Sequence, residues 1–186
     1  MFTAILHILT AFGLSSASGL NAYIPLLIVA LTARFTGWIK LDPPFDLLAN
    51  EWVIVALIVL LAIEMIVDKI PAADTLNDII QTFIRPAAGA LLFAANTSVI
   101  NLPPAIAVVL GLVLAFSVHA VKATARPVVT ASTGGLGNMF VSVAEDIVSA
   151  FVSLIAIVVP ILVGLILVFF VLVLLMVRSR RRATTN

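Results

Sequence analysis

The sequence predicts an all-α fold, a single polytopic membrane bundle of about six transmembrane spans with polar side chains at membrane depth. Composition is the first reason: 63% of the 186 residues are hydrophobic and 10% are charged, whereas soluble domains carry about 25% charged residues. The second reason is that the apolar residues form runs close to the ~20 residues that a membrane helix needs. A soluble fold of this size has too little interior for so much apolar surface.

Residue usage also excludes several classes of protein. The chain contains no cysteine, which excludes disulfides, thiolate metal sites and cysteine nucleophiles. No Lys or Arg precedes Arg34, so a cleaved signal peptide is not expected. We expect one transmembrane domain over residues 1–177 and a short basic tail over residues 178–186. Nucleic-acid binding is not expected, because four arginines beside a span are explained as an orientation signal.

The first apolar run, Phe2 to Ala33, is too long for one untilted span. Small residues, an asparagine and a proline interrupt it around Gly19–Pro25. These residues predict a broken or re-entrant helix, which survives at membrane depth only where it packs in protein or lines a cavity. A small-residue packing face with a proline kink is the alternative. Residues 34–51 follow as a polar loop, with tryptophans at its borders as expected at a membrane interface.

The second predicted span is Trp52 to Val67, and Glu64 and Asp68 share one face near its end. Residues 71–86 are interpreted as a short helix lying on the bilayer or as a solvated connecting helix. The third span is Ala87 to Ile100, opened by Arg85-Pro86 and closed by a turn.

The fourth span is Ala105 to Val121, and His119, Lys122 and Arg126 stack on one face if the helix continues; Pro127 is expected to end it. Two boundaries are possible after that. Either residues 128–144 form a span before one very long helix, or Pro127–Gly137 contains a loop or re-entrant segment and residues 137–159 form the span. We favour the second, because a helix of 31 residues would measure about 46 Å. The last span is then residues 161–177.

The arginine cluster of residues 178–182 predicts a cytoplasmic tail. Counting back through six spans also places the N-terminus in the cytoplasm. Eight of the ten Lys and Arg residues then lie on the inner side, and only Arg34 and Lys40 lie outside.

A weak internal repeat is suggested by two pairs of segments. Residues 19–23 resemble residues 135–139, and Arg85-Pro86 resembles Arg126-Pro127. Duplicated halves with interrupted helices are common in transporters. Chance similarity is the alternative in so apolar a chain.

Taken in order, several short motifs resemble a bacterial membrane family, domain of unknown function 4126, over roughly residues 13–177. The resemblance implies a multi-helix membrane fold and supplies no substrate or reaction. We therefore expect a multi-pass protein of the bacterial inner membrane. The motifs are Gly19-Leu20-Asn21-Ala22, Asp68-Lys69-Ile70-Pro71 with Asp74, Arg85-Pro86, His119 with Lys122, Arg126-Pro127, and Gly137-Asn138 leading to Ser142 and Glu145-Asp146.

Ionisable residues inside a membrane mostly face the bundle interior and pair with one another. This predicts one polar site that binds a small polar or ionic solute, so the main hypothesis is a small transporter or channel. Glu145 or Asp146 would carry a coupling cation or proton, and Lys122 and Arg126 would meet an anionic substrate. The candidate residues are Asn21, Glu64, Asp68, Lys69, Asp74, Arg85, His119, Lys122, Arg126, Asn138, Ser142, Glu145 and Asp146.

Two other hypotheses remain open. One is a membrane scaffold or assembly protein whose buried charges only fix the helix register. The other is a metal-dependent enzyme acting on a lipid phosphate, in which Asp68, Asp74 and Asp78 hold a divalent cation. No catalytic motif supports an enzyme. No cofactor is expected, the identity of any metal is left open, and the expected partners are the lipid bilayer, the solute and a second copy in a homodimer.

Overall fold

The computed structural model describes residues 1–68, 71–134 and 136–160, together with residues 162, 165–166, 168–173 and 176. The side chains of residues 71–76, 99 and 136 lie outside this description. Every regular element within the described part is a helix, which confirms the all-α prediction. Lys69, seven of the 17 residues of the predicted last span and the basic tail lie outside the described residues.

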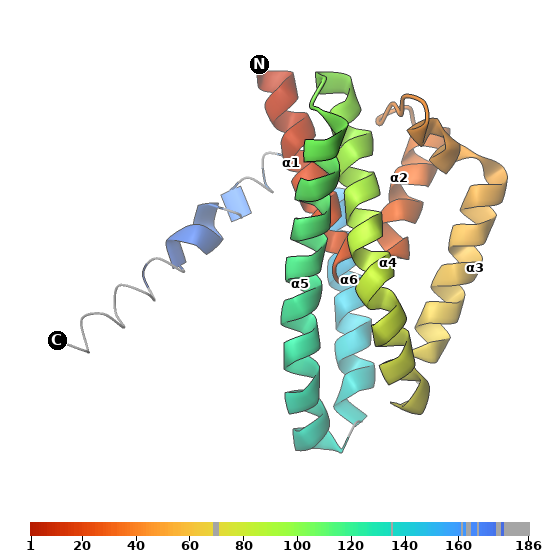
Figure 1. Cartoon of the computed structure of the whole chain (residues 1–186), viewed down its shortest axis with the longest axis vertical. Helices are drawn as coiled ribbons and strands as arrows, with labels where there is room; N and C mark the ends of the chain where they lie inside the picture. Colours follow the sequence, from red (N-terminus) through yellow and green to blue (C-terminus); the bar gives the residue numbers. More distant parts are fainter. Residues whose placement is uncertain are drawn as a thin grey trace.

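Helices α3 to α6 run side by side in alternating directions, and the first two helices, α1 and α2, fill one half of the bundle (Figure 1). Two 3-10 turns, η1 and η2, occupy connections at the end where α4 meets α5. The elements are α1 Phe2–Ser18, α2 Tyr23–Phe35, η1 Phe45–Ala49, α3 Glu51–Val67, α4 Pro71–Thr97, η2 Ser98–Ile100, α5 Pro104–Thr133 and α6 Leu136–Val158.

The helices α1 and α2 form a hairpin that turns back inside the bundle. The hydroxyl of Thr10 donates to the carbonyl of Ala156 at 2.9 Å, near the end of α6. At the far end of α1, the hydroxyl of Ser149 donates to the carbonyl of Ala17 at 3.0 Å. Val29 returns to the same buried cluster as Ala156, so α2 retraces the direction of α1. The chain therefore reverses at Gly19–Ala22, opposite the middle of α6.

The sequence explains why the hairpin breaks where it does. The amide side chain of Asn21 accepts from the backbone N–H groups of Tyr23 and Ile24, at 2.9 and 3.0 Å, and so satisfies the start of α2. Pro25 lies in the first turn, where the missing N–H costs no hydrogen bond. Gly19 lies so close to α5 that a Cβ would stand 2.5 Å from the carbonyl oxygen of Ala115. The predicted break near Gly19–Pro25 is confirmed.

The hairpin changes the predicted path of the chain. His7, Trp38 and Lys40 line one small pocket together, so the N-terminal half of α1 lies at the same end as residues 36–50. Residues 2–33 therefore begin and end at the same end of the bundle.

Two predicted boundaries at prolines are also wrong. Helix α4 runs without a break from Pro71 to Thr97, so residues 71–86 are not a separate interfacial helix. Helix α5 runs through Pro127 to Thr133, so no re-entrant segment lies within Pro127–Gly137. A proline is tolerated in such a helix when neighbouring groups compensate for its lost hydrogen bond. The turn falls at Gly134, whose φ of 62° suits glycine, and the favoured boundary of the next span is confirmed by α6 (Leu136–Val158).

Helices α4 and α5 approach each other closely at two glycines. A Cβ on Gly111 would lie 2.3 Å from the carbonyl oxygen of Gly89 and 2.6 Å from the Cβ of Phe93. These separations are far shorter than van der Waals contact, so the two backbones pack together only because both side chains are absent.

We expect Gly111→Ala to destabilise the protein by ~1–3 kcal/mol or more, because the added methyl overpacks this crossing. The measurement is the thermal unfolding midpoint in detergent. Val109→Leu is the matched control: it also adds one carbon on α5, at a side chain that is 58% exposed. Equal midpoints for the two variants would contradict the close packing.

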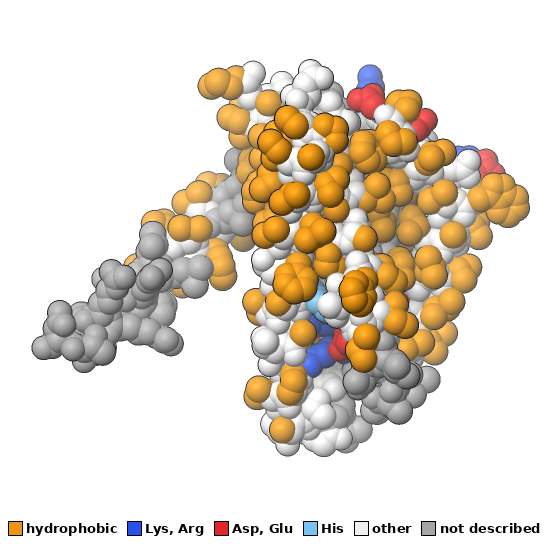
Figure 2. Space-filling model, viewed as in Figure 1, with side chains coloured by type: hydrophobic (Ala, Val, Ile, Leu, Met, Phe, Trp, Pro, Cys, Tyr) orange, Lys and Arg blue, Asp and Glu red, His pale blue; other side chains and the backbone are white. Residues whose placement is uncertain are grey.

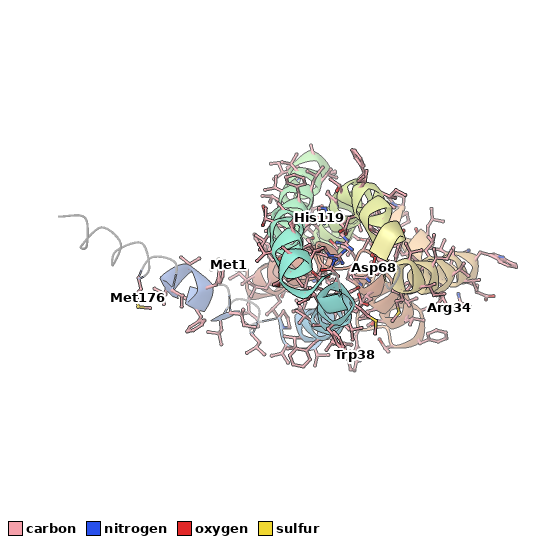
Figure 3. All side chains as sticks on the ribbon, turned by 90° about the horizontal axis from the view of Figure 1, so that it is seen from below. Met1, Arg34, Trp38, Asp68, His119 and Met176 are labelled. Carbon is pink, nitrogen blue, oxygen red and sulfur yellow. The ribbon has the colours of Figure 1, made fainter. Side chains whose placement is uncertain are left out.

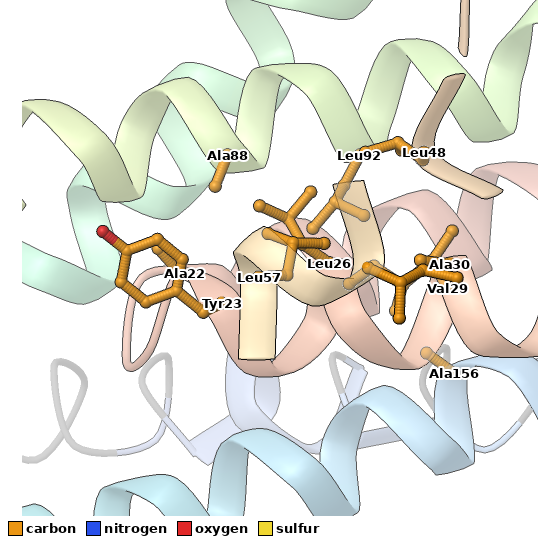
Figure 4. Close-up of a cluster of buried hydrophobic side chains, with 12 residues drawn as sticks. Ala22, Tyr23, Leu26, Val29, Ala30, Leu48, Leu57, Ala88, Leu92 and Ala156 are labelled. Carbon is orange, nitrogen blue, oxygen red and sulfur yellow. The ribbon is translucent and has the colours of Figure 1, made fainter. Parts of the chain in front are cut away.

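The hydrophobic core surrounds α2, where Leu26, Val29 and Ala30 contact α3, α4 and α6 (Figure 4). Leu57 of α3 and Leu92 of α4 enter the same cluster. The core therefore holds α2 against α3, α4 and α6, and it fixes the position along the bundle at which the chain turns.

The face of the bundle shown in Figure 2 is mostly apolar. Within the described residues, two helices are long and apolar enough to cross a membrane, residues Pro104–Thr133 and Gly137–Val158, and only 22% of the most apolar window of each is buried. Such helices expose their apolar side chains, unlike the core helices of a soluble protein, and this is the pattern of a membrane protein.

Candidate functional site

The interior holds a cluster of charged side chains where α3, α4, α5 and α6 converge, below the turn of the hairpin. We call it the charge cluster. Seen from the end where α5 turns into α6, His119 and Asp68 both lie toward the middle of the bundle (Figure 3). Its described members are Glu64, Asp68, Asp78, Arg85, His119, Lys122, Arg126, Glu145 and Asp146.

One part of the charge cluster is buried away from solvent. Arg85 of α4 donates to Glu64 of α3 at 3.1 Å, and their side chains are 0% and 1% exposed. The same guanidinium meets Nδ1 of His119 at 3.2 Å, and Nε2 of His119 meets the hydroxyl of Thr82 at 3.0 Å. This chain of contacts joins three helices and leaves no room for a solute between its members.

Asp68, at the end of α3, bonds two neutral donors. The side chains of Asn77 and Ser142 donate to its two oxygens at 2.6 and 2.8 Å. The guanidinium of Arg126 lies 3.9 Å away. Asp68 therefore links α3 to α4 and α6 through hydrogen bonds more than through an ion pair.

The second part of the charge cluster lies between α4, α5 and α6. Lys122 pairs with Glu145 at 2.7 Å, and Arg126 pairs with Asp78 at 2.7 Å. Arg126 also reaches Glu145, at 3.5 Å. Both cations of α5 are therefore already neutralised by carboxylates of the neighbouring helices.

The turn of the hairpin joins the charge cluster through two contacts. The amide nitrogen of Asn21 donates to Asp146 at 2.9 Å, and Lys122 donates to the carbonyl of Leu20 at 3.3 Å. A helix C-terminus carries partial negative charge and a helix N-terminus carries partial positive charge. Lys122 thus meets the end of α1, and Asp146 lies beside the start of α2, with the sign that stabilises each end.

The charges do not cancel among the described members. They comprise five carboxylates, on Glu64, Asp68, Asp78, Glu145 and Asp146, and three cations, on Arg85, Lys122 and Arg126. Among the ion pairs of the described residues none involves Asp146. An excess of buried carboxylates attracts cations or protons.

A cavity of about 520 Å³ opens beside the second part of the charge cluster. Its mouth lies between α4 and α5, where charged and histidine side chains are visible between apolar ones (Figure 2). The volume is in the range of small-molecule sites. Its lining consists of Asp78, Ile79, Thr82, Ala123, Arg126, Pro127, Thr130, Ala131 and Asn138.

The structure brings most of the predicted site residues together and separates one. Asn138 bonds Thr130 at 2.9 Å in the wall of the cavity, whereas Asn21 bonds Asp146 at the hairpin turn. The side chains of Lys69 and Asp74 are outside the described residues. The others form three groups of direct contacts: Asn21 with Asp146; Glu64 with Arg85 and His119; and Ser142, Asp68, Arg126, Glu145 and Lys122.

Sequence reasoning left Asp78, Thr82 and Thr130 out of the candidate site. Asp78, Thr82 and Arg85 follow at steps of four and three, which places them on one face of a helix. That signal was present in the sequence. It was not used, because Asp78 was considered only as a possible metal ligand.

The metal-site interpretation has no cluster to support it in the described part of the chain, where no three His, Cys, Asp or Glu side chains form a group that could hold an ion. Asp68 is bonded to Asn77 and Ser142, and Asp78 is paired with Arg126. The carboxylates are used in protein contacts.

Fold and site together define an all-helical protein with a re-entrant hairpin and a buried charge cluster. The chain belongs to the family described as domain of unknown function (DUF4126), whose model matches residues 8–180. The resemblance read from the sequence motifs is therefore confirmed. No curated protein and no solved structure matches the chain.

Proposed function

We propose that the protein is an integral membrane transporter for a small polar or ionic solute. The observation that carries the proposal is the break of the α1–α2 hairpin in the middle of the bundle, against buried charges. Broken helices persist at membrane depth where they line a cavity or a binding site, and transporters bind solutes at such breaks. The contacts of Asn21 with Asp146 and of Lys122 with Leu20 support this function.

The proposal requires a polytopic arrangement in the membrane. Helices α3 to α6 and the segment 161–177 would cross the bilayer, and the hairpin would enter and leave from one side. Large apolar side chains on the outside support this: Phe140 is 72% exposed and Phe151 is 63% exposed. In water such a surface would cause aggregation, whereas in a bilayer it contacts lipid.

Charge distribution supports an orientation in a bacterial inner membrane. Arg85, Lys122 and Arg126 lie toward the end where α5 turns into α6, and that end would face the cytoplasm. Arg34 and Lys40 lie at the opposite end, together with the start of α1. The N-terminus would then be outside, which replaces the earlier expectation, and the C-terminal tail would remain inside.

Labelling with a membrane-impermeant thiol reagent tests this topology, because the chain has no cysteine of its own. Cysteines at Thr3 and Asp46 should both react in intact cells, and a cysteine at Ala183 should react only after lysis. Opposite behaviour of the Thr3 and Asp46 positions would contradict the re-entrant hairpin. Thr3 and Asp46 are exposed and lie outside the charge cluster, so folding of these two variants is expected to be unaffected.

Within the proposed transporter, Asp146 is the residue best suited to bind a coupling proton or cation. It is partly buried beside the broken helix, and the described residues offer it a neutral amide instead of an ion pair. Glu145 is less suited, because Lys122 and Arg126 already neutralise it. Solute would pass between the hairpin turn and the cavity when the contacts of α5 with α6 rearrange.

Flux into dye-filled proteoliposomes tests the function. Purified protein should accelerate the entry of at least one member of a panel of protons, sodium, potassium and small organic ions, in a saturable way. Equal flux in protein-free liposomes for the whole panel would count against transport.

One observation favours the scaffold hypothesis as a second candidate. The Glu64–Arg85 pair is fully buried and has no access to the cavity lining. A pair of this kind can fix the register of helices without any ligand. The scaffold role would be supported if the protein carried no flux while forming a defined homodimer or complex.

A further inference from the structure

The cavity beside the second part of the charge cluster is lined by both polar and apolar side chains. Asp78, Arg126, Thr130 and Asn138 supply polar groups, and Ile79, Ala131 and Pro127 supply apolar surface. A ligand that fits both must itself have a polar end and a short apolar body.

The polar groups of the cavity lack hydrogen-bond donors more than acceptors. Among the described residues, Oδ1 of Asp78 and Oδ1 of Asn138 are buried and have no partner. Pro127 has no N–H, so the carbonyl of Ala123 one turn earlier loses its helical donor. Oδ1 of Asp78 and Oδ1 of Asn138 are the buried acceptors, whereas Ala123 is exposed. A buried acceptor left without a donor is destabilising, and a ligand that donates hydrogen bonds would satisfy it.

The local charge also favours a cation. Among the described residues, the carboxylates of Asp78, Glu145 and Asp68 lie 2.7, 3.5 and 3.9 Å from the guanidinium of Arg126. Lys122 neutralises Glu145 at 2.7 Å. Among the described side chains, two cations face three carboxylates, which leaves one negative charge in this group, so an anion would have to displace an existing ion pair before it could bind.

We propose that the cavity binds a small organic ammonium ion, a primary amine cation with a short apolar body. A primary ammonium has three donors and no acceptor, which matches in number the acceptors on Asp78, Asn138 and Ala123. Its apolar body contacts Ile79 and Pro127, and it enters sideways through the mouth between α4 and α5. The inference rests on the proposed transport function, since it names the chemical class of the solute.

Equilibrium binding to detergent-purified protein tests this inference without requiring transport. The probe is butylammonium chloride at pH 7, measured by calorimetry and by the shift of the thermal unfolding midpoint. Sodium butyrate and butanol are compared at the same ionic strength, together with tetramethylammonium, a cation without donors. Butylammonium should bind at least tenfold more tightly than the other three.

Two tryptophan substitutions provide a matched pair on α4. Ile79 lines the cavity and Ile80 does not, and their exposures are similar, 58% and 55%. Ile79→Trp should fill the cavity and abolish butylammonium binding, whereas Ile80→Trp should leave it unchanged. If Ile79→Trp does not fold, Ala131→Phe fills the same cavity from α5.

The outcomes separate this inference from the transport proposal. Preferential binding of butyrate, equal binding of tetramethylammonium, or equal binding to both tryptophan variants would overturn the ammonium site. Absence of butylammonium binding together with flux of another solute would also overturn it, and would leave transport standing. Binding of butylammonium without flux of any solute would support the site and remove the transport function.

Discussion

Replacing Arg85 by methionine should lower the free energy of unfolding by about 3–5 kcal/mol, the cost of leaving one partner of a buried ion pair without the other. The side chains of Arg85 and Glu64 are 0% and 1% exposed, so the remaining carboxylate has no access to water. The substitution also removes the Arg85 guanidinium that contacts Nδ1 of His119. Denaturant-induced unfolding in mixed micelles measures the loss.

The chain contains a matched control for this prediction. Arg34 and Glu51 form another Arg–Glu pair between consecutive helices, and their side chains are 32% and 73% exposed. Exposed pairs contribute ~0.2–1 kcal/mol, so Arg34→Met should have a small effect. A loss for Arg85→Met no larger than that for Arg34→Met would contradict the buried pair.

A double variant distinguishes the cost of an orphaned charge from the value of the pair. Glu64→Leu combined with Arg85→Met replaces both charges by apolar side chains of similar size. Such replacements are often neutral or stabilising, so the double variant should recover most of the stability that Arg85→Met loses. Without recovery, the pair itself, or its link to His119, would be the stabilising element.

The sequence predicted those features that depend on neighbouring residues. The small residues and Asn21 ahead of Pro25 predicted a broken helix, because capping and proline rules act over a single turn. The boundaries of α6 followed from the length that a membrane helix can have. The composition alone predicted an all-helical chain.

Proline misled the prediction at two places, for one physical reason. In water, a proline in a helix interior costs about 3 kcal/mol and ends most helices. Pro86 and Pro127 lie inside α4 and α5, beside arginines that pair with other helices. Those contacts between helices stabilise α4 and α5 at the positions where proline removes a backbone hydrogen bond. A rule that considers only neighbouring residues does not include such contacts.

The sequence predicted a break at Gly19–Pro25 but not whether the chain reverses there, for a related reason. Both a kinked span and a re-entrant hairpin satisfy the pattern of residues 2–33. Which one forms depends on contacts such as Thr10 with Ala156, which are 146 positions apart in the chain. Likewise, the polar residues were predicted as one set, but the pairing of Arg126 with Asp78 needed the continuous helix α4.

Asp146→Asn should abolish solute flux, or lower it at least tenfold, while the protein keeps its fold. Nδ2 of Asn21 donates to Oδ1 of Asp146, and an asparagine at position 146 keeps an oxygen that can accept this bond. The substitution therefore removes the negative charge beside the hairpin and little else. If Asp146 binds the coupling proton or cation, transport stops, because the neutral amide holds neither.

Three measurements make this prediction specific to Asp146. Flux into proteoliposomes is compared for the wild-type chain, Asp146→Asn and Asp46→Asn, the last at an exposed carboxylate of η1. Thermal unfolding midpoints establish that all three proteins fold equally well. Glu145→Gln is less informative, because it leaves Lys122 without its partner at 2.7 Å and should lower stability as well as flux. Normal flux through folded Asp146→Asn would mean that the carboxylate only stabilises the start of α2, and the coupling role would then have to be abandoned.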